Sequence, residues 1–150
     1  MKKVVSLISA LLLSLTLVAC GNNASNPMQS ALDTRQADLK AKFEDYIPEE
    51  LTKINDARSA VKGDYVLFVI ADNPETAISA FEANASAAAS AEELMQKVKE
   101  RTAFVDEMLL LSAAKVSDLY TLSDKVSESC VYVSASGATA EELAIFKIKQ

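Results

Sequence analysis

Residues 62–72, KGDYVLFVIAD, decide the fold of this chain. Lys62-Gly63-Asp64 has the composition of a tight turn, and every residue from Tyr65 to Ile70 is apolar or aromatic. A strand that is apolar on both sides is buried on both faces, which is typical of the middle of a sheet. Residues 57–61 precede the turn and can supply the paired strand, so the stretch predicts a β-hairpin.

The C-terminal region predicts a second hairpin, again with a glycine in its connection. Val131, Val133 and Ala135 alternate with the residues between them, and residues 143–148 alternate in the same way. A competing signal is the segment 139–142, Thr-Ala-Glu-Glu, which matches a capping box and would start a helix at residue 140. Alternation of β-branched and aromatic residues is the stronger pattern here, so we predict a strand from about residue 143.

Apolar residues recur at helical spacing over residues 31–46 and predict the first helix. These residues are Leu32, Leu39, Phe43 and Tyr46. Pro48 ends this helix and can open a short second one, since proline is well suited to the first helical position.

Three further helices are predicted, two of them from local start signals. Asn73 followed by Pro74 is a favourable helix N-terminus, and Ser90 with Glu93 forms a capping box. Residues 83–91 between them have low complexity and can be a linker or a weak helix. Residues 108–120 are apolar enough to pack, and we expect a loop followed by a short helix at about 112–120.

Together these elements predict an α+β fold. The economical architecture is a single four-stranded, mainly antiparallel sheet made of the two hairpins, with the helices packed largely on one face.

The N-terminus has the layout of a secretory signal. Lys2 and Lys3 precede an uncharged apolar run at residues 4–19, which is shorter than the roughly 20 residues of a transmembrane helix. The segment Leu17-Val18-Ala19-Cys20-Gly21 resembles the lipoprotein box of bacteria. The resemblance implies cleavage before Cys20 and a diacylglyceryl group on its sulfur. The alternative is an ordinary secretory signal with a chance cysteine.

We therefore expect a lipoprotein signal peptide at residues 1–19, a lipidated tether at 20–30 and a single α+β domain at 31–150. Two acyl chains hold a protein on a membrane where one chain does not. The expected location is the extracytoplasmic face of the cell membrane, with the membrane as partner through Cys20. A flexible ten-residue tether spans roughly 17 Å, which keeps the domain close to the bilayer.

The composition excludes several kinds of chemistry. The chain has a net charge of −6, and loss of Lys2 and Lys3 with the signal makes it −8, so we expect no nucleic acid partner. The chain has no histidine, which removes Ser-His-Asp and Cys-His catalysis and most transition-metal sites. Cys130 lies in an apolar strand without a nearby base, and a structural role is the favoured interpretation over a reactive thiol.

Three pairs of adjacent acidic residues occur, at 49–50, 92–93 and 141–142. Each adjoins a predicted or alternative helix start, where carboxylates complement the helix dipole. Adjacent residues of a helix do not face one point, so these pairs do not predict a catalytic dyad. We predict no catalytic residue, no metal site and no cofactor.

Two longer stretches resemble one protein family. Residues 43–57, FEDYIPEELTKINDA, followed by residues 62–72, and residues 119–149 are similar to small lipoproteins of Gram-positive anaerobes that carry a domain of unknown function. In that family the part similar to residues 134–147, SASGATAEELAIFK, comes first, and the part similar to residues 43–72 follows. The resemblance therefore implies a circular permutation, with the new join near residues 83–90. It also implies that residues 31 and 149 are neighbours in space.

The leading functional hypothesis is a non-enzymatic module at the membrane surface that binds an envelope protein, a peptide or a small ligand. The alternatives are a weak carboxylate-based hydrolase and a passive envelope component without a ligand. A convergent pair of carboxylates in a deep pocket would favour the hydrolase.

Overall fold

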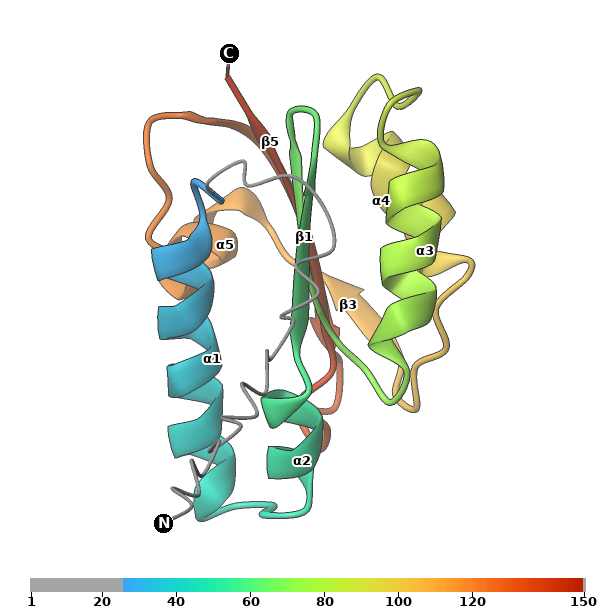
Figure 1. The fold of residues 1–150 in the computed structure, drawn as a ribbon. Coiled ribbons are helices and arrows are strands. Elements are labelled where there is room, and N and C mark those ends of the chain that lie inside the picture. Colours follow the sequence, from blue (N-terminus) through green and yellow to red (C-terminus); the bar gives the residue numbers. More distant parts are fainter. Residues whose placement is uncertain (1–25, 150) are drawn as a thin grey trace, which may run out of the picture.

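A computed structural model describes residues 26–149 as an α+β domain with helices on both sides of one open sheet (Figure 1). The helices are α1 (Gln29–Glu44), α2 (Glu50–Asn55), α3 (Pro74–Asn84), α4 (Ala91–Lys99) and α5 (Ala113–Leu119). The strands are β1 (Arg58–Lys62), β2 (Tyr65–Ile70), β3 (Met108–Leu110), β4 (Val126–Ser134) and β5 (Glu142–Ile148).

The two predicted hairpins form one antiparallel sheet, in the strand order β1-β2-β5-β4-β3. The C-terminal strand β5 pairs with the whole of β2, from Tyr65 opposite Lys147 to Ile70 opposite Glu142. The prediction that both hairpins share a sheet is confirmed, as is the choice of a strand over a helix after residue 140. In Figure 1 the beginning of α1 and the end of β5 lie at the same end of the domain.

The sheet has five strands, and the prediction of four was wrong. The additional strand β3 pairs with β4, with Met108 opposite Ser134 and Leu110 opposite Tyr132. Three apolar residues are too few to show alternation in a sequence. Their extended conformation comes from pairing with the edge of β4, which would otherwise be open. The local sequence pattern does not reveal this pairing.

The prediction that the helices pack largely on one face was also wrong. Helices α1, α2 and α5 cover one face of the sheet, and α3 and α4 cover the other (Figure 1). The physical reason lies in β2, which is buried at all six positions. Val66, Phe68 and Ile70 join the core under α1, while the alternate residues join the core under α3 and α4. A strand that is apolar on both faces needs a helical layer on each.

The helix start signals had mixed outcomes. Ser90 caps α4, because its Oγ accepts a hydrogen bond from the Glu93 amide at 3.0 Å, and the Glu93 carboxylate accepts one from the Ala89 amide. Pro74 occupies the first turn of α3 as predicted. Asn73 is the N-cap residue of α3, as predicted, but its side chain makes no capping hydrogen bond.

The packed domain begins before residue 31. Helix α1 starts at Gln29, and the Met28 side chain is 2 % exposed and belongs to the core under α1. Residues 28–30, predicted as tether, are therefore part of the domain. The predicted signal peptide and Cys20 lie outside the described residues. Among residues 26–149, no helix has the length and hydropathy needed to cross a bilayer.

Candidate functional site

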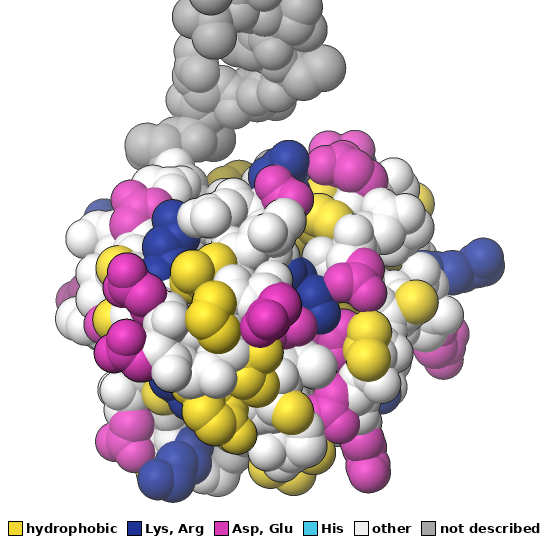
Figure 2. Space-filling view, turned by 90° about the horizontal axis from the view of Figure 1, so that it is seen from below, with side chains coloured by type: hydrophobic (Ala, Val, Ile, Leu, Met, Phe, Trp, Pro, Cys, Tyr) yellow, Lys and Arg dark blue, Asp and Glu magenta, His cyan; other side chains and the backbone are white. Residues whose placement is uncertain are grey.

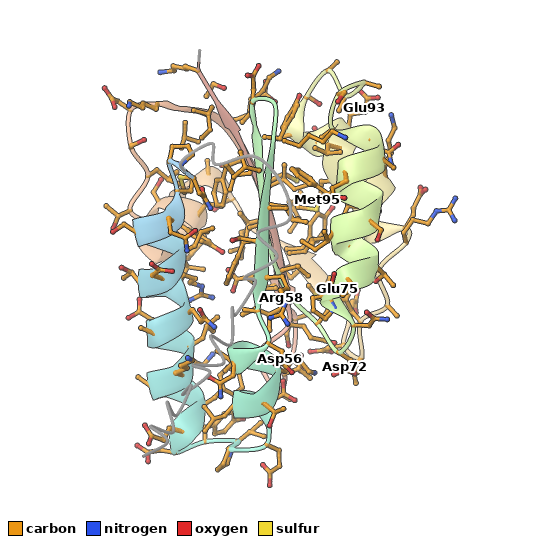
Figure 3. All side chains as sticks on the ribbon, in the orientation of Figure 1. Asp56, Arg58, Asp72, Glu75, Glu93 and Met95 are labelled. Atoms are coloured by element: carbon orange, nitrogen blue, oxygen red, sulfur yellow. The ribbon has the colours of Figure 1, made fainter. Side chains whose placement is uncertain are left out.

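A depression of about 360 Å³ opens at the end of the domain where β2 ends and the β4–β5 connection returns. Helix α2 forms one wall, and the segment after α4 forms another. The lining residues are Glu49, Glu50, Thr52, Lys53, Asp56, Ala71, Asp72, Val105 and Thr139. We call this depression the acidic pocket. Figure 3 places Asp56 and Asp72 at this end of the sheet, near Arg58.

Lys53 is the cation at the centre of the acidic pocket. Its Nζ lies 3.3 Å from Glu50 Oε2, 3.2 Å from Asp72 Oδ1 and 3.7 Å from Glu141 Oε1. Burial lowers the pKa of Lys53, but the hydrogen bond to Asp72 and the charges of the glutamates outweigh this effect and raise it. Lys53 is therefore charged at neutral pH, and three carboxylates already surround it.

Glu141 lies beside Lys53 and holds the neighbouring loops in place. Its carboxylate is fully buried and accepts hydrogen bonds from the amides of Val105 and Asp106 and from the Thr139 hydroxyl. Glu50 Oε2 accepts a further bond from the Ala140 amide at 2.9 Å. Hydrogen bonds to charged groups are stronger than those between neutral groups, so these two carboxylates fix the pocket wall.

The acidic pocket keeps a net negative charge after Lys53 is counted. Four carboxylates line it against one lysine, and the Asp72 side chain is 65 % exposed. Seen from below, this end of the domain shows acidic side chains around exposed apolar ones (Figure 2). The arrangement can attract and hold a cationic group, because carboxylates accept hydrogen bonds from ammonium and guanidinium donors.

Within the described part of the chain, no group of three or more Asp, Glu or Cys side chains is arranged to hold a metal ion. A second depression, of about 480 Å³, lies between α3 and Arg101 and is flatter. Its lining mixes Asn73, Glu75 and small residues without converging charges.

A second polar centre lies inside the core under α1. Arg35 donates to both carboxylate oxygens of Glu142, with Nη2 to Oε2 at 2.6 Å and Nε to both oxygens at 3.1 Å. The Tyr120 hydroxyl donates to Glu142 Oε1. Burial, followed by the charge of Glu142, raises the pKa of Tyr120 well above its usual value, so Tyr120 stays a hydrogen-bond donor. This triad ties α1 and the end of α5 to β5.

The adjacent acidic residues of the sequence take separate roles. Glu141 contacts Lys53 and Glu142 contacts Arg35, because successive residues of an extended chain point to opposite sides. The helix-start interpretation is confirmed for Glu93, which completes the cap of α4. It was wrong for Glu141 and Glu142, because strand β5 begins at Glu142 and no helix starts there.

Cys130 is buried in the sheet, 6 % exposed, between β5 and the core under α4. Burial, with a smaller effect of the Glu92 charge, raises the pKa of its thiol to about 11. The thiolate is the reactive form of cysteine, and almost none of it is present at neutral pH. The structure thus supports the structural interpretation of Cys130.

Sequence reasoning missed Arg35, Lys53 and Tyr120. A signal for Arg35 was present, since it lies three residues after Leu32 and four before Leu39, on the apolar face of the first helix. A charged residue at a core position indicates a buried partner. No local signal connects Lys53 with Glu141, because the two residues come from distant elements.

The comparisons with known proteins give one partial match to a family model and indicate no activity. No curated protein and no solved structure matches the chain. Residues 5–71, which run from the predicted signal through β2, match the model of a family described as Domain of unknown function (DUF4358).

Proposed function

We propose that this protein is a lipid-anchored binding module of the cell envelope, whose ligand presents a cationic group to the acidic pocket. The anchor is the diacylglyceryl group expected on Cys20, and the location is the extracytoplasmic face of the membrane. The lipoprotein-box residues Leu17–Cys20 behind a short apolar run support this part of the proposal.

The observation that carries the binding role is the imbalance of charge in the acidic pocket. Lys53 is already surrounded by Glu50, Asp72 and Glu141, while Glu49 and Asp56 on the same wall are exposed. A cation entering the pocket therefore meets a surplus of carboxylates. The net charge of −8 expected for the mature chain attracts cations over a longer range.

Binding is favoured over hydrolysis by the way the buried carboxylates are used. The Glu141 oxygens accept bonds from two backbone amides and a hydroxyl, and Glu50 accepts one from Ala140. A general acid or base needs a carboxyl group within hydrogen-bond reach of the substrate proton. Carboxylates engaged in this way support the pocket wall instead.

The proposal is tested by titrating the full-length protein with spermidine, a soluble polycation, and following heat or amide chemical shifts. Replacing Asp72 by Asn and Glu49 by Gln together removes two exposed charges of the pocket. Exposed ion pairs contribute about 0.2–1 kcal/mol each, so we expect affinity to fall roughly 2- to 30-fold. The matched control, Asp118→Asn with Glu100→Gln, removes two exposed charges outside the pocket.

Equal weakening by the pocket and control variants would show that spermidine responds to net charge alone, which contradicts a site in the pocket. No binding by the native protein would favour the passive envelope component. Release of a product from an envelope-derived substrate, lost on replacement of Asp72, would favour the hydrolase.

The proposal also includes membership of the family of Gram-positive lipoproteins, with the two parts of its domain in swapped order. The pairing of β5 with β2 supports this proposal, because it joins the N-terminal and C-terminal parts of the domain in one sheet. Such pairing does not depend on where in the sequence the chain begins and ends. Circular permutation is tolerated where chain ends lie close together, and α1 begins at the end of the domain where β5 finishes (Figure 1).

A further inference from the structure

Strand β3 leaves one edge of the sheet open. It is the last strand in the order and pairs with β4 alone. On the side that faces β4, the Glu107 carbonyl accepts a hydrogen bond from the Ala135 amide, and the Leu111 amide donates one to the Val131 carbonyl. Hydrogen bonds of an antiparallel strand alternate between its two sides. The main-chain groups of Met108 and Leu110 therefore point away from β4, to the open edge.

This edge lacks the protection seen at the other end of the sheet. The outer strand β1 carries Arg58 and Lys62, and charged residues on an edge strand prevent pairing with other chains. Strand β3 has no charged residue, and its Leu109 and Leu110 are 53 % and 51 % exposed. An exposed apolar edge strand is suited to adding a further strand from a partner.

The open edge is continuous with the acidic pocket. Val105 lines the pocket and is 71 % exposed, and only Asp106 and Glu107 separate it from β3. The Val105 and Asp106 amides donate to Glu141, which contacts Lys53, so the segment entering β3 is fixed next to the pocket. A chain paired with β3 and extended past its beginning would reach the carboxylates of the pocket.

We propose that β3 is the docking strand for an extended, basic segment of a partner protein, whose main chain pairs with β3 and whose Lys or Arg side chain enters the acidic pocket. This inference rests on the proposed function and names the ligand class. Charge complementarity selects this occupant over a second copy of the chain. Two copies each carrying an expected charge of −8 repel one another, and a paired copy brings no cation to the pocket.

The probe is a short acetylated and amidated peptide of alternating lysine and valine. The control is a peptide of alternating glutamate and valine, which has the same apolar residues and therefore shows how much of the signal comes from apolar contacts or from binding to the detergent. The full-length isotope-labelled protein is held in a zwitterionic detergent, and amide chemical shifts are followed. We expect the lysine peptide to shift the amides of residues 105–111 and the glutamate peptide to leave them unchanged.

Two variants test the pairing itself. Leu110→Pro removes an outward amide while keeping the bonds to β4, and Leu109→Lys places a charge on the edge. We expect each variant to bind the lysine peptide about 3- to 10-fold more weakly, from the loss of a main-chain hydrogen bond or from charge repulsion. Ser59→Lys makes the same change of charge on the exposed edge strand β1 and should bind as the native protein does. If Leu110→Pro does not fold, the affinity of Leu109→Lys for the lysine peptide tests the docking on β3.

The outcomes separate this inference from the proposed function. Native affinity in both β3 variants, with affinity lost in Asp72→Asn, would overturn strand docking and leave the cation site intact. Equal binding of both peptides at β3 would overturn the basic partner, while the spermidine titration would still decide the cation site. Shifts of the β3 amides that depend on protein concentration without peptide would identify a second copy as the occupant.

Discussion

Replacing Glu142 by Gln should destabilise the domain strongly, although the change removes only a charge. Glu142 is 1 % exposed and receives three hydrogen bonds from Arg35, whose side chain is 11 % exposed. A glutamine cannot neutralise the guanidinium, so the variant leaves a cation in the core under α1. Removing one partner of a buried ion pair costs about 3–5 kcal/mol. Since Arg35 keeps slight contact with water, we expect about 3 kcal/mol.

The measurement is the free energy of unfolding by urea, from circular dichroism, with a matched surface pair as control. Lys115 Nζ lies 3.6 Å from Asp118 Oδ2, and both side chains are about 70 % exposed. Asp118→Asn should change the free energy by less than about 1 kcal/mol, as exposed pairs do. Adding Arg35→Met to Glu142→Gln removes the uncompensated cation and should recover part of the loss.

The reasoning is refuted if Glu142→Gln unfolds at the same urea concentration as Asp118→Asn. It is also refuted if Arg35→Met makes the glutamine variant less stable. In either case the triad would contribute packing rather than charge compensation.

Other regions of the chain give four further predictions. A thiol reagent should modify Cys130 slowly in the folded protein and rapidly in denaturant, because burial raises the pKa of the thiol to about 11; equal rates would show an exposed thiol. The Asp106 carboxyl accepts bonds from Ser134 and Ser136, which lower its pKa from 3.8 to about 2. Its contribution to stability is therefore present above about pH 4 and lost as pH falls through 2, and Ser134→Ala should move its carbon-13 titration midpoint upward; an unchanged midpoint contradicts this. Met28→Ala should cost about 2–5 kcal/mol of unfolding free energy as a buried truncation, whereas a tether residue would cost nothing. Cys20→Ala should abolish palmitate incorporation in cells, and labelling equal to the native level would disprove the anchor.

Much of the secondary structure followed from local patterns. The run from Tyr65 to Ile70 predicted a central strand, because no exposed strand can keep six apolar residues in water. The Ser90–Glu93 box predicted the start of α4, since both hydrogen bonds of a cap join residues within one turn. These signals are local, so the sequence alone contains them.

Other features depend on contacts between distant segments. Strand β3 is a strand because β4 lies beside it, and its three residues read as loop in isolation. The helices were assigned to one face of the sheet even though the burial of β2 on both faces was recognised. The apolar stripe of an amphipathic helix shows that the helix packs against a core, but it does not show which face of the sheet the helix covers. Only the packed chain places α3 and α4 opposite α1.

By itself, the sequence determined a hairpin-based antiparallel sheet with amphipathic helices, and it predicted the lipid anchor at Cys20. The candidate site was decided by the tertiary structure alone. Lys53 and Glu141 stand far apart in the chain, yet their charged atoms lie 3.7 Å apart, and Arg35 meets Glu142 across a similar separation in sequence. Periodicity reports which face of an element is buried, whereas charge pairing depends on where folding brings those faces together.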